Sequence, residues 1–308
     1  MTNGLVRGVA LKRRSWGGWF LLLTAWAGAL SGAAVMANQE DVAIDKIAWA
    51  ELDFPPFQIL GGEFAGTGSF DGLSELLIRR LAGISHEVVP MSFSRREEQL
   101  RQGRQMCTPG IFRTLARERY LVFSMPALIH LDNRLVFLAS RADRFPSGAT
   151  IDLEELFKRS DLIGSVISER SFAPNIDALL KRQGGKPNLV MRPIRSLQML
   201  ELLLNGDIDY TILFPHEAAY LERQLGRQGQ LASRPITGTP PYIMTHVACT
   251  RGPWGEQAVE RINGVLKGSL ATPEYRRFSE RWYADSDKAL IRQYYPQLLE
   301  AAHRAASR

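Results

Sequence analysis

The residues best suited to chemistry lie in one stretch, from Cys107 to Ser124. Its pattern predicts the end of a strand, a polar turn that carries Thr114 and Arg117, and an apolar return. A guanidinium at a strand end offers a planar set of donors to a carboxylate, so Arg117 is a candidate anion ligand. The alternative, from this stretch alone, is an exposed arginine at the start of a helical turn.

The N-terminal segment, residues 1–37, predicts an export signal. A basic region precedes a short apolar run and a small-residue cleavage site. The apolar run is too short for a stable membrane span. We expect cleavage after Ala37. The pair Arg13-Arg14 leaves open whether export is general or of the twin-arginine type. No cysteine stands directly after the cleavage site, which argues against a lipoprotein anchor, so we expect a freely soluble periplasmic protein.

The composition indicates a globular chain without a nucleic-acid partner. The chain has 308 residues, of which 45% are hydrophobic and 23% charged, enough for two domains. The signal contains four of the 38 lysine and arginine residues and no acidic residue. The rest of the chain therefore has 34 basic and 32 acidic residues, which nearly balance. Without a charge excess, binding to nucleic acid or to an anionic membrane has little electrostatic support.

The two cysteines, Cys107 and Cys249, are compatible with one disulfide in an oxidising compartment and equally with two buried thiols. No Cys-x-x-Cys or His-x-x-x-His spacing occurs in the sequence. We therefore expect neither a metal site nor a cofactor.

Apolar periodicity predicts two similar α/β domains. The first run alternates strands with helices, which favours a mostly parallel sheet: 46–52, 70–83, 86–91, 97–103 and the Cys107 strand. A strand at 134–139 follows, and we expect the passage between the domains near residue 140. The alternation of helices and strands then repeats at 153–157, 162–167, the helix through Leu180, 189–191, 197–204 and 208–213. A strand at 243–249 and helices from residues 254, 273 and 287 complete the chain.

Several short motifs occur in an order that resembles the type II periplasmic solute-binding proteins, in the family-3 group that serves amino-acid and related ABC importers. The motifs are Asp53-Phe-Pro-Pro-Phe57, Gly68-Ser-Phe-Asp71, Thr114-Leu-Ala-Arg117, Phe123-Ser124, Gly206-Asp-Ile-Asp209, Ile262-Asn263 and Arg281-Trp-Tyr283. The resemblance implies a monomer of two α/β lobes, each a mixed, mostly parallel sheet flanked by helices. Lobe 1 would comprise residues 38–139 and 241–308, and lobe 2 residues 140–240, with ligand in the cleft and hinges near 140 and 240.

The resemblance also implies ligand-binding residues. In lobe 1, Phe54 matches an aromatic placed against the ligand, although it could instead pack under the Pro-Pro turn. Arg117 matches the arginine that clamps the ligand carboxylate, with Phe112 and Thr114 in the same turn. In lobe 2, the matching anion-binding turn holds three residues: Ser168, Arg170 and Ser171.

One departure from the family changes the expected ligand. Amino-acid binders usually place an acidic residue at the position of Phe214, where it accepts the ligand ammonium. Without it a buried ammonium is costly, unless Glu51, Asp53 or Glu217 substitutes. With Arg170 in the opposing turn, we expect a small anionic solute, carboxylate-bearing or aromatic, delivered to an ABC permease or reported to a membrane sensor.

The same resemblance implies a Cys107–Cys249 bridge, because the family's topology places the two strands side by side. Two alternative functions stay open. The first is an exported enzyme of the dehydratase type on this scaffold, with Glu51, Asp53 or Glu169 as acid or base, although no paired carboxylates are evident. The second is an accessory protein whose cleft is filled by Phe112 and Phe214.

Overall fold

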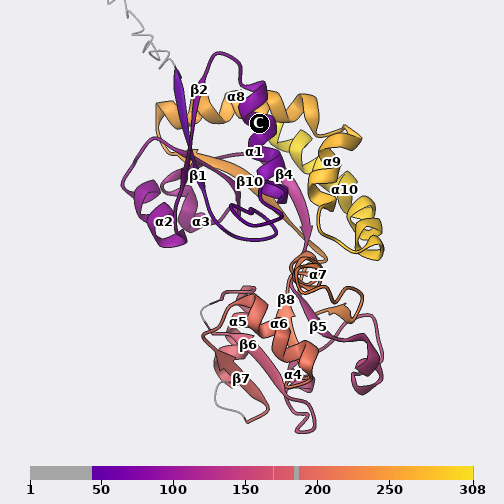
Figure 1. Cartoon of the computed structure of the whole chain (residues 1–308). Helices are drawn as coiled ribbons and strands as arrows, with labels where there is room; N and C mark the ends of the chain where they lie inside the picture. The colour runs from indigo at the N-terminus through magenta and orange to yellow at the C-terminus, as the bar shows by residue number, and fades with distance from the viewer. Residues whose placement is uncertain (1–43, 169, 184–186, 308) are drawn as a thin grey trace, which may run out of the picture. The chain divides into compact units, whose positions relative to one another are not determined.

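The computed structural model describes residues 44–168, 170–183 and 187–307. The predicted export signal lies outside these ranges. The described chain builds two five-stranded sheets flanked by helices, which confirms the predicted two-lobe α/β fold (Figure 1). A search of the described helices finds none with the length and apolar character needed to cross a membrane.

The first lobe is the sheet β2-β1-β3-β10-β4 and the helices that cover it. Its strands are β1 (Lys46–Glu51), β2 (Ser85–Pro90), β3 (Cys107–Ile111), β4 (Leu121–Leu131) and β10 (Tyr242–Thr250). Its helices are α1 (Ser69–Arg80), α2 (Phe93–Arg101), α3 (Leu115–Glu118), α8 (Pro253–Ser269), α9 (Pro273–Glu280) and α10 (Asp285–Ala306). Helices α8, α9 and α10 pack against β4.

The second lobe is the sheet β7-β6-β8-β5-β9 with its helices. Its strands are β5 (Arg134–Leu138), β6 (Gly164–Ile167), β7 (Leu189–Arg192), β8 (Tyr210–Leu213) and β9 (Leu231–Pro235). Its helices are the short 3-10 helix η1 (Ala139–Arg144), α4 (Leu153–Leu156), α5 (Pro174–Gln183), α6 (Ser196–Asn205) and α7 (Pro215–Gln224).

Both sheets share one topology. In each, the strand next to one edge runs antiparallel to both of its neighbours: β10 in the first lobe and β5 in the second. The three strands on the other side are parallel to one another. The antiparallel strand is in each case the one that has just arrived from the other lobe. The repetition predicted from the sequence is therefore a repetition of architecture.

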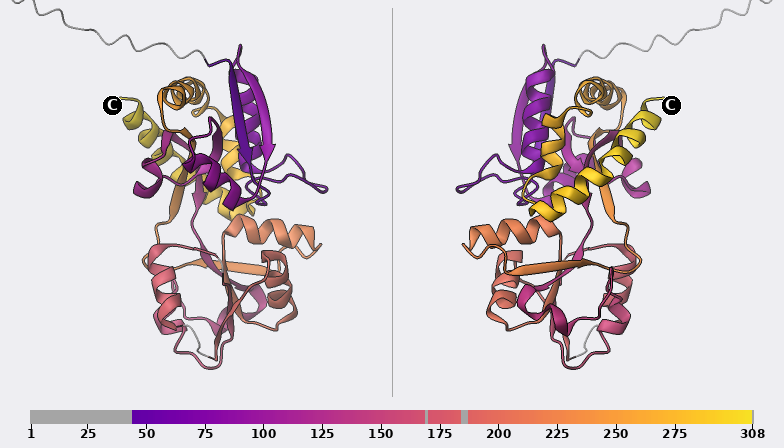
Figure 2. Two further views of the ribbon diagram at one scale, coloured as in Figure 1. Left: turned by 90° about the vertical axis from the view of Figure 1, so that its left-hand side faces the viewer. Right: turned by 90° about the vertical axis from the view of Figure 1, so that its right-hand side faces the viewer.

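The chain passes between the sheets twice (Figure 2). The first passage is Asp132-Asn133, and the second lies between β9 and β10. The sequence prediction placed the first limit near residue 140, but β5 already pairs with β8 and β9 and so belongs to the second sheet. Next to the first passage, Arg134 Nη1 lies 3.0 Å from Asp287 Oδ1 of α10. Hinge motion at these passages stays a prediction.

Among the helices that differ from the sequence prediction, α2 and α7 help to build the site. Helix α2 begins before residue 97 because Ser92 caps it, its Oγ accepting from the Arg95 amide at 3.3 Å. Helix α7 was not predicted. It begins with Pro215, and Glu217 accepts a hydrogen bond from the amide of Phe214 at 3.4 Å, an arrangement that favours a helix start.

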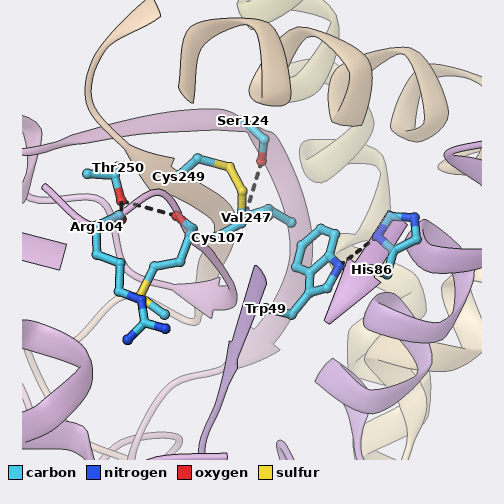
Figure 3. The surroundings of a disulfide bond; sticks show 9 residues. Trp49, His86, Arg104, Cys107, Ser124, Val247, Cys249 and Thr250 are labelled. Atoms are coloured by element: carbon cyan, nitrogen blue, oxygen red, sulfur yellow. Dashed lines mark hydrogen bonds between the residues drawn. A yellow bond between two sulfur atoms is a disulfide. The ribbon is translucent and has the colours of Figure 1, made fainter. Parts of the chain in front are cut away.

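A disulfide joins Cys107 of β3 to Cys249 of β10, which confirms the predicted pair. The two residues face each other across an antiparallel strand pair, and both are fully buried. Figure 3 shows the surroundings of the bond, where the Val247 amide donates to Ser124 Oγ at 3.0 Å. The disulfide thus fastens the late strand β10 to β3, the central strand of the first sheet.

Candidate functional site

Arg117 lies in the turn that follows β3. Thr114 caps α3, its Oγ1 accepting from the Arg117 amide at 3.3 Å. The guanidinium folds back over the turn and donates from Nη1 to the carbonyl of Phe112 at 3.0 Å. Its Nη2 lies 3.6 Å from Glu97 Oε1, and the side chain is 26% exposed. Three of the predicted site residues therefore belong to one hydrogen-bonded turn.

Aromatic rings surround this turn and leave a cavity of about 80 Å³, which we call the Arg117 pocket. Phe54 stacks on Phe57 at 4.9 Å between centroids and meets Phe93 edge-on at 5.3 Å. The residues that line the pocket are Leu52, Phe54, Gln58, Phe70, Phe93, Arg96, Pro109, Gly110, Ile111, Phe112 and Arg117. The pocket thus combines cationic and aromatic groups, which suits a ligand with an acidic group on an apolar body.

Gly110 is required for this packing. Its φ of +64° is one that other residues rarely adopt, and a Cβ atom there would lie 2.2 Å from the ring of Phe70. The backbone at the end of β3 can therefore approach the aromatic wall closely.

In the second lobe, Arg170 forms a two-pronged ion pair with Glu217. Nη1 and Nη2 each lie 2.8 Å from one oxygen of the carboxylate. Glu217 also accepts from Ser196 Oγ at 2.6 Å, and its side chain is only 3% exposed. Both charges are therefore internally paired, so Glu217 does not offer a ligand ammonium a free carboxylate.

The remaining residues of the predicted second-lobe turn lie on the surface. Ser171 donates from Oγ to Asp177 Oδ2 at 2.5 Å, and the Ser168 amide donates to the carbonyl of Arg192 at 3.0 Å. Both serines are exposed. The structure thus does not gather Ser168, Arg170 and Ser171 around one point, and their role as ligands stays a prediction.

Phe214 is buried in an aromatic cluster that joins the two lobes. Its ring meets Phe57 edge-on at 5.3 Å, and the Arg170 guanidinium lies 5.2 Å from its centroid on another side. The ring centroid of His216, two residues later, lies 4.4 Å from that of Phe57 and 5.7 Å from that of His130 of β4. The position where amino-acid binders carry an acid is therefore packed against the first lobe.

A second contact between the lobes lies on the loop after β1. Phe64 of that loop meets Trp282 at 4.9 Å and Tyr220 of α7 at 5.9 Å. The Trp282 indole donates to the carbonyl of Thr67 at 3.1 Å, which fixes the ring. Separation of the lobes would have to part the ring of Tyr220 from those of Phe64 and Trp282.

The two buried histidines predict a loss of stability in acid. Burial lowers the pKa of His130 to about 3, and burial, with His130 and Arg170 nearby, lowers the pKa of His216 well below its usual value. In the unfolded chain both take up protons near pH 6.5, so stability falls as the pH drops from about 6.5 towards 3.

His216→Phe should weaken this acid loss. Neither ring nitrogen of His216 has a hydrogen-bond partner in the described part of the chain, so the phenyl ring should also raise the free energy of unfolding at pH 7 by about 1 kcal/mol. Urea titrations of both proteins at pH 7 and pH 5 would check this. If the free energy of unfolding fell between pH 7 and pH 5 by the same amount in the variant as in the wild type, the prediction would be wrong.

The fold itself has many solved relatives, whereas the sequence matches no family model and no curated protein. A probable amino-acid ABC transporter extracellular-binding protein from Bacillus subtilis is 16% identical, with a TM-score of 0.61 over 79% of this chain and 100% of that chain. An ancestral cationic amino acid solute-binding protein is 17% identical, with a TM-score of 0.61 over 78% and 96%. The fold is that of the two-lobe periplasmic binding proteins.

Sensor domains share this binding-protein fold. A histidine kinase sensor domain described as similar to periplasmic binding proteins is 20% identical, with a TM-score of 0.55 over 77% of this chain and 94% of that chain. These neighbours are binding proteins and sensor domains rather than enzymes. At such identities the likeness establishes the fold alone.

The two described candidate acids of the enzyme alternative, Glu51 and Asp53, do not line the Arg117 pocket. Burial raises the pKa of Glu51 to about 7, with Asp71 adding to the effect, but neither residue lines the pocket. Asp53 Oδ1 accepts from the Leu60 amide at 3.3 Å, and Glu169 lies outside the described residues. Within the described ranges, His, Cys, Asp and Glu form no group of three that could hold a metal ion.

Sequence reasoning missed two features of the site. Arg96 and Phe93 of α2 line the Arg117 pocket, yet α2 looked like a polar surface helix. The Glu217 partner of Arg170 was also missed. The Pro215 helix start was a usable signal for α7, but no local pattern indicated that Arg96 is buried.

Proposed function

We propose that this chain is an exported solute-binding protein whose ligand carries a carboxylate held by Arg117. The observation that carries the proposal is the Arg117 pocket, where Arg117, on the short helix after β3, shares the lining with phenylalanine rings. Arg117 gives one hydrogen bond to a carbonyl and only a distant contact to Glu97, so it keeps donors for a ligand.

The ligand should lack an ammonium group. Several structural neighbours are described as binding arginine or cationic amino acids. At the position where amino-acid binders usually carry an acid, this chain has Phe214. The nearby carboxylate of Glu217 is already paired with Arg170. A ligand cation here would lose its hydration without a partner. A small aromatic or apolar carboxylate fits better.

The ligand would stabilise the closed arrangement of the lobes, and either an importer or a membrane sensor would read that arrangement. The fold is shared by proteins of both kinds. The export signal predicted for residues 1–37 would place the protein in the periplasm.

A thermal-shift screen of the purified protein tests the proposal. The panel would contain aromatic carboxylates, dicarboxylates, amino acids and small peptides. A ligand at a hundredfold over its dissociation constant stabilises the folded state by about 2.7 kcal/mol, which moves the melting temperature measurably. We expect shifts with carboxylates and none with cationic amino acids; the reverse order would refute the proposed ligand class.

A filled, non-binding cleft is the second candidate, and the packing of Phe214 against Phe57 favours it. In that case the lobes would be held together by their own side chains and the protein would act through a partner protein. No shift with any compound in the panel would support this reading.

A further inference from the structure

Arg96 occupies an unusual position for a charged residue. Helix α2 buries only Arg96 and, one turn later, Leu100, which mark the side that faces the sheet. The neighbouring Arg95 is exposed. Arg96 is 5% exposed overall, and it is one of the residues that line the Arg117 pocket. Arginine is rarely buried to this degree unless its charge is matched.

The charge of Arg96 is only partly matched. Its Nη2 lies 2.8 Å from Glu97 Oε1, while its Nε is shielded from solvent and has no hydrogen-bond partner in the ranges described. Glu97 must also serve Tyr120, whose hydroxyl donates to Oε2 at 2.7 Å, and the more distant Arg117. Two guanidinium groups therefore share one carboxylate, which leaves an excess of one positive charge.

That excess charge is at the pocket. Little solvent reaches Arg96, and this burial lowers its pKa, with Glu97 opposing the effect. An uncompensated charge in such surroundings is costly, and a bound anion removes the cost. The ring of Phe93, whose centroid lies 5.4 Å from Cζ of Arg96, attracts the guanidinium but supplies no negative charge.

We infer that Arg96 is a second cationic ligand of the Arg117 pocket, and that the pair makes the site select a singly charged oxyanion over a neutral group of the same shape. This inference rests on the proposed function, since it concerns the same pocket. It adds a residue outside the turn that carries Arg117, and it sets the charge of the ligand head group.

Matched substitutions test the inference with benzoate and its neutral isostere benzamide as probes. The wild type should bind benzoate and discriminate against benzamide. Arg96→Met should weaken benzoate binding by about tenfold or more, because it removes a charge-assisted hydrogen bond. Its stability should be unchanged or higher, since Glu97 keeps Tyr120 and Arg117. Arg95→Met removes the same charge from the exposed face of the same helix and should bind as the wild type does.

Glu97→Gln provides the opposite test. It raises the local excess from one positive charge to two, so benzoate should bind several-fold more tightly, although the fold should be less stable. A purely structural role for Arg96 predicts instead that Arg96→Met lowers stability and leaves affinity unchanged.

The outcomes separate the inference from the proposed function. If benzoate binding depends on Arg117 but Arg96→Met matches Arg95→Met, the inference is wrong and the proposed function stands. If the wild type binds benzoate and benzamide equally or binds neither, the inference is wrong. If no carboxylate in the wider thermal-shift panel binds, the proposed function is wrong as well.

Discussion

Arg170→Ala is expected to lower the free energy of unfolding by about 3 kcal/mol. It would leave the carboxylate of Glu217, 3% exposed, without its two-pronged partner, and an uncompensated buried charge is among the costliest single changes. Ser196 and the Phe214 amide would remain as donors, so the loss should stay below that of a fully isolated charge. Urea titration monitored by circular dichroism would measure the change.

The second lobe offers a matched control for this experiment. Arg182 of α5 pairs with Glu154 at 2.9 Å, but both side chains are about 60% exposed. Arg182→Ala should therefore change stability by less than about 0.5 kcal/mol. Equal effects of the two alanine variants would show that the Arg170–Glu217 pair does not support the fold as we describe.

Removing the disulfide should have an effect of similar size. Replacing Cys107 and Cys249 with alanine opens a loop closed across 142 residues, and loss of a native bridge typically costs about 2–4 kcal/mol. The double variant should unfold at lower urea than the oxidised wild type. Reduced wild type should resemble the variant, which separates the cross-link from the loss of two buried sulfurs.

Mass spectrometry after alkylation gives the direct check on the bridge. Both cysteines are joined in the disulfide, so the unfolded, unreduced protein should show no alkylated cysteine. Two alkylated thiols in protein purified after export would contradict the disulfide and the stability expected from it.

The fold was predictable because its elements carry strong local signals. Apolar residues at strand and helix spacing marked most of the strands and long helices, and the motif order indicated two lobes. The limit near residue 140 was less certain because β5 is a short apolar strand that could continue either sheet. Its pairing with β8 and β9 is a tertiary fact that no local pattern contains.

The placement of the candidate site residues was predictable only in the first lobe. Thr114, Arg117 and Phe112 are neighbours in sequence, so one turn brings them together. Arg170 instead finds its partner on α7, and the burial of Arg96 depends on how α2 lies against the sheet. Such pairings arise from packing between elements, which spacing along the chain does not reveal.

The most direct measurement is calorimetric titration of the wild type and Arg117→Ala with the carboxylate that gives the largest thermal shift in the screen. The turn leaves Arg117 donors free for the ligand, so the variant should lose at least about tenfold in affinity, the value of one charge-assisted hydrogen bond. Arg119→Ala, an exposed arginine two residues later, should bind as the wild type does. Equal affinity in Arg117→Ala and the wild type would contradict the account.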